Sequence, residues 1–289
     1  MTINRNIAIA SASKLPAALT VWRLIEAGRL AATDRPQSVL DFWARDAADA
    51  RSLVTLDTLL GFTSGFSGGD VDAGCIGSSQ ISLADCVRQI HDGGLQAPPD
   101  TAYDYGPAHL QIAAAMVQAC EGRGFETVMR EVLLNPLGLT LETRYPLLGG
   151  DNTRIAGSLR STPAEYGRIL QALLAGTLVQ NRAAYLADRI GDRTITYRPA
   201  AAAANDIDWH YGAGFWRVCN KPVYDAQCDA NPVISSPGAF GFTPWVDFGN
   251  GYWAIIAMEE PIGVGSDPSR SGVTLQIQLQ PLIEAELSR

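Results

Sequence analysis

The sequence predicts an α+β fold: a mostly helical part, then an antiparallel sheet, then a last helix. Apolar residues recur at helical spacing in segment after segment up to about residue 205. Beyond that point, short aromatic and β-branched segments are separated by turn residues, and the final segment returns to a helical pattern. Of the 289 residues, 47% are hydrophobic, which is enough for a sizeable core. We therefore predict one intimate structural unit, helical over 1–205 and sheet-bearing over 206–289.

The first part contains a series of segments with the apolar spacing of helices. They cover residues 13–30, 36–50, 54–61, 82–95, 107–121, 125–139, 161–176 and 183–190. Several carry end signals: Pro16 lies in a first turn, where proline is tolerated, and Ser82 suits an N-cap. For the helix over 161–176, Ser161 or Thr162 is expected at the cap, with Glu165 available for a capping box.

The sequence pattern of the second part predicts strands rather than helices. The segments "YGAGFWRV" at 211–218, "GAFGFTPWVDF" at 238–248 and "GYWAIIAMEE" at 251–260 are short, aromatic and β-branched, and turn residues separate them. A helix is expected to start after Ser271 and close the chain. The glycine-rich stretch 65–77 is expected to be a loop, and it lacks the Gly-Lys-Ser/Thr of a phosphate-binding loop.

Charge and hydropathy argue against several classes of partner. The formal net charge is −8, which disfavours nucleic acid and anionic membranes as partners. No apolar stretch approaches the roughly 20 residues that span a bilayer. We expect no membrane span, no metal, no cofactor and no nucleic-acid partner. The sequence leaves the oligomeric state open.

The cysteines fall into two local pairs and one single residue. Cys75 lies close to Cys86, Cys219 lies close to Cys228, and Cys120 is left over. Two short disulfides, Cys75–Cys86 and Cys219–Cys228, would indicate an oxidising compartment, either periplasmic or extracellular. The alternative is four free thiols. Zinc is disfavoured because neither pair has the CxxC spacing. The chain shows no signal peptide.

A serine and a lysine lie one helical turn apart near the start of the chain. Residues i and i+3 share a helix face, so the Lys14 amine can reach the Ser11 oxygen and accept its proton. The helix N-terminus also offers backbone N–H groups to a developing oxyanion. Taken alone, Ser11 is more simply read as a helix cap.

The surrounding segments resemble the serine β-lactamase and penicillin-binding-protein superfamily. The resemblance is carried by "IASASKLPAALTVWRLIEAGRLAATD", "VTLDTLLGFTSGF", "PPDTAYDYGPAHLQ", "RIAGSLRSTPAEYGRIL" and "SSPGAFGFTPWVDF", which occur in the family's order. The branch that it resembles contains class C β-lactamases, D-alanyl-D-alanine carboxypeptidases and family VIII carboxylesterases. The implied fold is β-lactamase-like, with a helical region packed on an antiparallel sheet and the active site in the cleft between them.

The resemblance implies roles for individual residues. Ser11 would be the nucleophile, Lys14 its basic partner, and Tyr105 a residue that relays protons. Tyr103 is the less favoured tyrosine, since Tyr105 has the better spacing to the helix that follows. The oxyanion hole would use the backbone N–H groups of Ser11 and Ala239.

Two departures from the family pattern bear on the substrate. Pro107 stands where the family's Tyr-x-Asn motif has asparagine, and Ser-Pro-Gly at 236–238 stands where it has Lys-Thr-Gly or His-x-Gly. No cation is left in that motif to meet a substrate carboxylate. We take Pro107, Ser236 and Gly238 as substrate-binding candidates, with Gly238 letting the backbone approach the acyl group.

The three histidines are scattered, and no G-x-S-x-G elbow is present. His109 lies one turn beyond Tyr105, so it is a substrate-binding candidate that lines the cleft, or else a structural histidine.

Only ten residues precede Ser11, where the family has about two strands. The resemblance then implies that these N-terminal strands are missing and that three C-terminal strands form a sheet with an unpaired edge.

These observations predict a serine hydrolase that forms an acyl-enzyme with small ester substrates. The alternatives are a β-lactamase or D-alanyl-D-alanine carboxypeptidase, and a catalytically impaired binding or scaffold protein with the same fold. Loops 65–77 and 222–227 are expected to set the substrate range.

Overall fold

A computed structural model describes residues 2–289 apart from 68–73, 147–149, 200–201, 203–206 and 264. Its α-helices are α1 Lys14–Glu26, α2 Leu56–Leu60, α3 Leu83–Gly93, α4 Ala108–Glu121, α5 Phe125–Met129, α6 Pro163–Leu174, α7 Arg182–Tyr185, α8 Ala226–Ala230 and α9 Pro268–Leu287. Its strands are β1 Ile7–Ala8, β2 Ala102–Asp104, β3 Arg160–Ser161, β4 Thr194–Tyr197, β5 His210–Tyr211, β6 Trp216–Val218, β7 Val233–Ser235, β8 Thr243–Asp247 and β9 Tyr252–Ile256.

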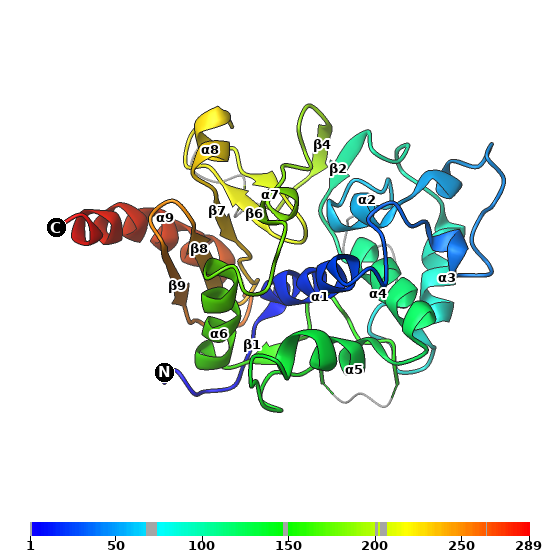
Figure 1. Cartoon of the computed structure of the whole chain (residues 1–289), viewed down its shortest axis with the longest axis horizontal. Coiled ribbons are helices and arrows are strands. Elements are labelled where there is room, and N and C mark those ends of the chain that lie inside the picture. Colours follow the sequence, from blue (N-terminus) through cyan, green and yellow to red (C-terminus); the bar gives the residue numbers. More distant parts are fainter. Residues whose placement is uncertain (1, 68–73, 147–149, 200–201, 203–206, 264) are drawn as a thin grey trace.

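The main sheet is an antiparallel meander in the order β5-β6-β7-β8-β9 (Figure 1). The predicted combination of a helical part and an antiparallel sheet is therefore confirmed, but the prediction of three strands is wrong. The segment 211–218 forms β5 and β6 around a tight turn in which Gly212 N donates to Phe215 O. The segment 236–242 is a loop, closed by a hydrogen bond from Gly238 N to Phe242 O. Strand β8 therefore begins only at Thr243.

The strand that precedes Ser11 does not join this sheet. Strand β1 pairs antiparallel with β3 as a separate two-stranded unit. Strand β9 is the last strand at one end of the five-stranded order. A second small unit pairs β2 with β4 in parallel, which the sequence analysis did not predict.

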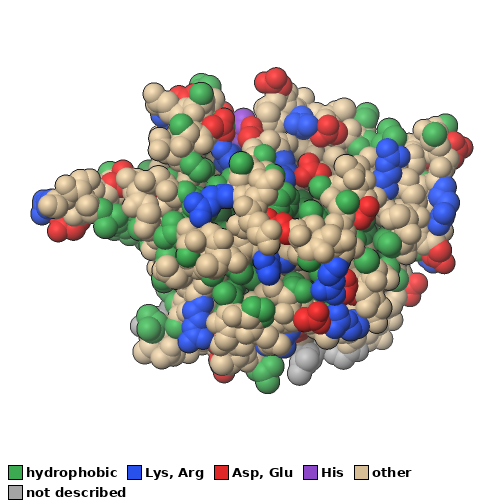
Figure 2. Space-filling model, viewed as in Figure 1, with side chains coloured by type: hydrophobic (Ala, Val, Ile, Leu, Met, Phe, Trp, Pro, Cys, Tyr) green, Lys and Arg blue, Asp and Glu red, His purple; other side chains and the backbone are tan. Residues whose placement is uncertain are grey.

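Helices cover both faces of the sheet at its β8–β9 end. Gly167 of α6 lies against the Trp253 ring, and Trp253 pairs with Val246 across the two strands. Gly272 of α9 lies against Thr243, which is three residues from Val246 and so points to the opposite face. The sheet is thus sandwiched between α6 and α9, and α9 extends beyond the body of the molecule (Figures 1 and 2).

Helix α1 runs through the middle of the molecule and joins its two parts (Figure 1). It packs against α4 and α5 on the helical side and is buried along most of its length. On the sheet side, the β5–β6 turn reaches it through Gly214, which has a φ of +78°. A Cβ on Gly214 would lie 2.3 Å from the Ala18 Cβ, so only glycine allows this approach.

The helix prediction is wrong over 36–50. That segment forms 3₁₀ turns at Pro36–Ser38 and Ala50–Leu53 rather than a helix. Aspartate side chains satisfy local backbone donors there, since Asp46 accepts from Ala48 N and Asp49 accepts from Arg51 N. Such bonds offer the backbone an alternative to helix formation.

Helices α3, α6 and α9 begin at or near their predicted starts. Ser82 is an N-cap as predicted, Thr162 rather than Ser161 caps α6, and α9 starts at Pro268, before the start predicted after Ser271. The Glu165 carboxylate does not close a capping box but accepts hydrogen bonds from Thr140 and Thr143 instead.

Both predicted disulfides are present. Cys75–Cys86 ties the loop before α3 to that helix, and Cys219–Cys228 ties the end of β6 to α8. Cys120 is an exposed free thiol. None of the described helices is long and apolar enough to cross a bilayer.

Candidate active site

Ser11 lies in a 3₁₀ turn, Ala10–Ser13, immediately before α1 begins at Lys14. The Lys14 Nζ donates to the Ser11 Oγ at 2.9 Å, so the predicted contact across one turn is formed. The residue before the serine, Ala10, has a φ of +45°, in the left-handed region that a non-glycine residue rarely adopts. Backbone strain of this kind persists only where the surrounding contacts hold it.

Hydrogen bonds from three directions hold this turn. The Ser13 hydroxyl donates to Ala10 O at 2.6 Å and accepts from Leu159 N at 3.1 Å. The Tyr166 hydroxyl donates to Ala12 O at 2.9 Å. The conformation around Ser11 is therefore determined by α6 and by the β3 segment as well as by α1.

The Lys14 side chain is buried, with 5% of its surface exposed. Its Nζ also donates to Ala156 O at 3.0 Å and lies 4.6 Å from the centre of the Tyr105 ring. A buried amine is stable only when polar or aromatic partners replace water. These partners aim the amine at Ser11.

The serine and the lysine face a cavity of about 280 Å³. Its described lining includes the predicted residues Ser11, Lys14, Tyr105, Pro107 and Ala239. The structure thus brings together side chains from α1, from the segment after β2 and from the β7–β8 loop. The described wall also contains Ala10, Gly106, Arg154, Ala156, Gly157, Tyr197, Pro199, Ala202, Trp209, Trp216, Pro237, Asp267, Ser269 and Val273.

Two predicted substrate-binding residues lie behind the cavity wall instead. The Ser236 hydroxyl is buried and donates to Ser11 O at 3.1 Å, so it supports the nucleophile's backbone. A Cβ on Gly238 would lie 2.2 Å from Ile9 O. The glycine therefore lets the β7–β8 loop approach the backbone before Ser11.

His109 does not line the cavity either. Its ring is fully buried, accepting from the Ser64 hydroxyl through Nδ1 and donating to Asp104 O through Nε2, each at 2.8 Å. The ring also stacks on Phe62, with ring centres 4.6 Å apart. Burial lowers the pKa of His109 to about 4, so the ring is neutral at ordinary pH. Of the two readings, the structural histidine is the one observed.

Tyr103 is separated from the reaction space as well. It is fully buried, and burial raises the pKa of its hydroxyl well above the usual value. Tyr105, two residues later, lines the cavity beside Lys14. The placement agrees with the preference for Tyr105 that spacing indicated.

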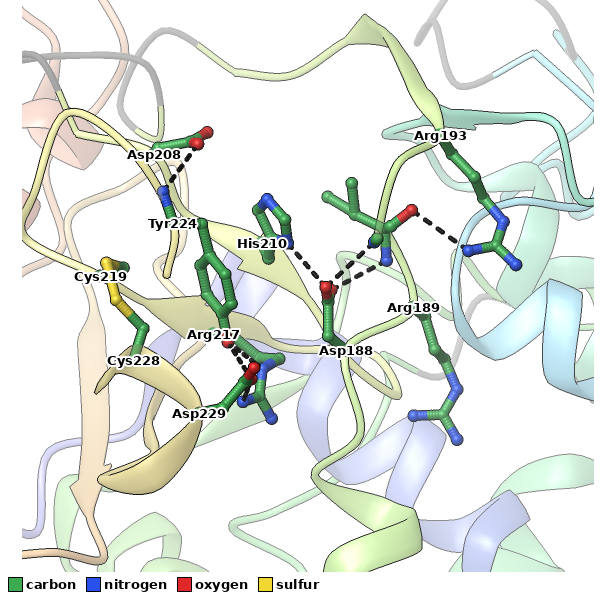
Figure 3. Close-up of polar contacts among 12 residues, drawn as sticks. Asp188, Arg189, Arg193, Asp208, His210, Arg217, Cys219, Tyr224, Cys228 and Asp229 are labelled. Atoms are coloured by element: carbon green, nitrogen blue, oxygen red, sulfur yellow. Dashed lines mark hydrogen bonds and ion pairs between the residues drawn. A yellow bond between two sulfur atoms is a disulfide. The ribbon is translucent and has the colours of Figure 1, made fainter. Parts of the chain in front are cut away.

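A second polar cluster lies outside the cavity lining, at the β5 edge of the sheet (Figure 3). The His210 Nδ1 is 2.8 Å from an Asp188 oxygen, and the ring stacks on Tyr224 with centres 3.9 Å apart. The Tyr224 hydroxyl accepts from Arg217 Nε at 2.6 Å and donates to Asp229 at 2.8 Å. Most of the polar side chains in this cluster therefore form hydrogen bonds with one another.

The two loops expected to set the substrate range do not appear in the described lining. The loop 65–77 falls partly on residues 68–73, which lie outside the described residues, and 222–227 packs with the second cluster. The sequence analysis missed Arg154 and Asp267, which do line the cavity. Arg154 stands two residues before Ala156, in a segment that the resemblance had already singled out for other reasons.

Comparison with known proteins finds similarity to a β-lactamase family and to a penicillin-binding protein. The sequence model of the family described as "Beta-lactamase" matches residues 4–266. "Penicillin-binding protein 4" from Amycolatopsis lactamdurans is 32% identical over 137 residues. That alignment covers 47% of this chain and 35% of the relative, so the chain matches about a third of the relative's length.

Solved structures agree in fold. A beta-lactamase/D-alanine carboxypeptidase from Yersinia pestis superposes with a TM-score of 0.71 at 18% identity, covering 99% of this chain and 86% of the other. EstCE1, a hydrolase with promiscuous acyltransferase activity, gives a TM-score of 0.70 at 16% identity, covering 94% and 86%. These two relatives carry different activities, so the shared fold does not decide the activity of this chain.

Proposed function

The chain belongs to the Beta-lactamase family, and we propose that it is a serine hydrolase that transfers the acyl group of an ester to Ser11 and then to water. The observation that carries this proposal is the 2.9 Å contact between Lys14 Nζ and Ser11 Oγ at the wall of a cavity. A serine hydroxyl is a weak nucleophile unless a base accepts its proton, and the lysine is positioned to do so.

The reaction has two steps. Ser11 Oγ forms a bond to the ester carbonyl carbon while its proton passes to Lys14, and the alcohol leaves with a proton delivered through Lys14 or Tyr105. Water then attacks the acyl-serine ester, gives up a proton to the same groups and releases the acid. We assign stabilisation of the oxyanion to the backbone N–H groups of Ser11 and Ala239, which both line the cavity.

Incubation with a fluorophosphonate, followed by intact-mass analysis and peptide mapping, tests this proposal. One adduct, located on Ser11, is the expected result. The Ser11→Ala variant should give none, and the matched Ser38→Ala variant, which removes an exposed serine outside the cavity lining, should react like the wild type. A folded protein that forms no adduct would refute the hydrolase and favour the scaffold alternative.

A β-lactamase or D-alanyl-D-alanine carboxypeptidase is the second candidate. The similarity to a penicillin-binding protein favours it, because such an enzyme would use the same Ser11 and Lys14. Turnover of a chromogenic cephalosporin at a rate comparable with that of simple esters would promote this candidate above the esterase. Cephalosporin turnover at least a thousandfold below ester turnover would retain the esterase.

We further propose that the chain works in an oxidising compartment outside the cytoplasm. The pairs Cys75–Cys86 and Cys219–Cys228 support this, because disulfides persist in such compartments. Alkylation of the denatured, unreduced protein should label only Cys120, the free thiol. Labelling of all five cysteines would contradict the proposal.

A further inference from the structure

Strand β9 is an open edge of the main sheet (Figure 1). All five of its residues, Tyr252–Ile256, are partly exposed, and among the described residues no hydrogen bond from another element reaches its outer side. Natural sheet edges are usually protected by charges, proline or a bulge. The segment 251–258 contains no charged residue and no proline, and its pairing with β8 is regular. This edge is therefore suited to pair with a further strand.

The pairing of β8 shows which residues of β9 direct their backbone groups outward. Pro244 has no N–H, and its carbonyl accepts from Ser236 N on the β7 side. Ile255 lies opposite Pro244, and backbone groups in an antiparallel sheet alternate between the two neighbouring strands. Ile255 and Trp253 therefore direct their N–H and C=O groups to the open side, whereas Ala254 bonds to β8.

The outer side of β9 is complementary to itself. Two copies of the strand can run antiparallel about a twofold axis that passes through Ala254. In this register Trp253 of one copy exchanges both hydrogen bonds with Ile255 of the second copy, and Tyr252 faces Ile256 of the second copy. Pairs of an aromatic with a β-branched residue stabilise antiparallel sheets. The axis itself passes through the smallest side chain of the strand, so nothing larger than a methyl group meets its own copy there.

The charges at the two ends of β9 are also complementary. The antiparallel arrangement places the β8–β9 turn of each copy beside the Glu260 end of the other. Exposed Arg182 lies against the ring of Phe248 in that turn, with its Cζ 5.1 Å from the ring centre. Glu260 is exposed and forms no ion pair within the part of the chain that the structure describes. Asp247, at the same end as Arg182, is buried and bonded to Asn250, so it does not oppose this contact.

We propose that the chain forms a twofold dimer through β9, so that one continuous antiparallel sheet crosses both copies. A second copy is the occupant that this edge fits, because both the side-chain pairs and the end charges match in the same register. No residue of β9 is part of the described cavity lining, so the dimer leaves the Ser11 centre open. The proposal does not depend on the ester chemistry.

Disulfide cross-linking tests the register. In a non-hydrogen-bonded antiparallel pair the two Cα atoms lie about 4.5 Å apart, a separation that a disulfide spans. The exposed thiol of Cys120 is first removed by Cys120→Ser. In that background, Ala254→Cys should form a disulfide-linked dimer in mild oxidant, seen as twice the mass on a non-reducing gel. The background chain should run as a monomer, because its remaining cysteines are paired within the chain.

Ile256→Cys in the same background is the matched control. Residue 256 faces residue 252 of the second copy, so it lies roughly 14 Å from its own counterpart. This variant should not cross-link alone, but it should cross-link when mixed with the Tyr252→Cys chain. Equal cross-linking of Ala254→Cys and Ile256→Cys alone would contradict pairing about Ala254. Absence of any cross-link in all of these samples would contradict the dimer.

Size-exclusion chromatography with light scattering tests the dimer without added cysteines. We expect the wild type to have twice the mass of the chain at tens of micromolar. Arg182→Glu and Glu260→Arg should each raise the dimer Kd by roughly 3- to 30-fold, because like charges replace two symmetric ion pairs. The variant with both changes should regain the wild-type Kd.

Two outcomes of this measurement would count against the proposal. A wild type that remains monomeric at several hundred micromolar would overturn it. Single charge variants that dimerise as tightly as the wild type would refute the assigned meeting of the two strand ends.

Discussion

The Ser11 centre and the His210 cluster contain comparable chemical groups in different surroundings. The first combines a hydroxyl, an amine and a tyrosine at the wall of a cavity. The second combines an imidazole, a carboxylate and a tyrosine, but its His210 ring is stacked on Tyr224 and bonded to Asp188 (Figure 3). Asp188 is engaged further by the backbone N–H groups of Ile190 and Gly191.

The difference shows that residue types alone do not make a catalytic centre. A nucleophile needs a base within hydrogen-bond distance and also open space where a carbonyl carbon can approach. Ser11 has both, whereas the Tyr224 hydroxyl already bonds to Arg217 and Asp229. We interpret the second cluster as a clamp that fastens the Cys219–Cys228 loop to the sheet edge.

The two lysines of the chain give the largest expected contrast, since Lys14 belongs to the first region and Lys221 to the loop of the second. Lys14→Met should lower kcat/KM for the best ester by on the order of a thousandfold or more, because the base is removed. Methionine fills a similar buried volume, so the melting temperature should show a folded protein. Lys221→Met, which removes an exposed ion pair with Asp225, should retain wild-type kinetics. A decrease in kcat/KM of less than tenfold in Lys14→Met would contradict the role of Lys14 as the base.

The tyrosines of the two regions give the next contrast. Tyr105→Phe should lower kcat by about a hundredfold with little change in stability, because the variant loses a proton relay that faces the cavity. Tyr224→Phe should retain kcat but lower the free energy of unfolding by about 1–2 kcal/mol, because two hydrogen bonds are lost. Steady-state kinetics and urea unfolding on both variants separate the outcomes. Equal effects on kcat would contradict the assignment of Tyr105.

His109 is expected to make the stability of the chain sensitive to acid. The pKa of buried His109 is about 4, against 6.5 for an ordinary histidine, because burial disfavours the charged ring. The unfolded chain therefore binds more protons between these values, and stability falls as pH drops from about 6.5 to 4. The slope from this group approaches roughly 1.4 kcal/mol per pH unit.

His109→Gln should lose this contribution, so its free energy of unfolding should fall less between pH 7.5 and pH 4.5 than that of the wild type. His210→Gln keeps His109 and serves as the control. Urea unfolding at both pH values measures the difference. A fall of the same size in the wild type and in His109→Gln would show that His109 does not carry the acid sensitivity.

The smallest expected effect concerns the support of the nucleophile. Ser236→Ala removes the hydroxyl that donates to Ser11 O at 3.1 Å. A lost hydrogen bond of this kind costs roughly 0.5–1.5 kcal/mol, so kcat/KM should fall by about two- to tenfold. Because the hydroxyl acts through the backbone, the fall should be the same for neutral and anionic esters. A change in the ratio between them would instead return Ser236 to the substrate-binding residues.

Local signals predicted the elements whose determinants lie within a few residues. Helix α6 follows from Thr162 at its cap and Pro163 in its first turn, and β9 follows from its aromatic and β-branched pattern. The prediction failed at 36–50, where aspartates bond to nearby backbone groups, and at 211–218, where two glycines allow a tight turn inside the apparent strand.

In the candidate site, too, short-range spacing predicted some contacts and not others. Ser11 and Lys14 are three residues apart, so one turn of backbone brings them together and the spacing alone predicts their contact. His109 and Ser236 were substrate-binding candidates, but both are buried and hydrogen-bonded outside the described cavity lining. Arg154 is 140 residues or more from both Ser11 and Lys14, and no periodic pattern connects it with them.

The sequence by itself determined the α+β order, most helix positions, the two cysteine pairings and the Ser11–Lys14 contact, because each depends on spacing along the chain. Only the tertiary structure decided which side chains face the cavity. That choice depends on the packing of α1 against α4, and on glycines such as Gly214 and Gly238 that let the sheet-side turns approach α1 and the backbone before Ser11. Contacts between residues more than a hundred positions apart arise when apolar faces are buried together, and short-range spacing does not encode them.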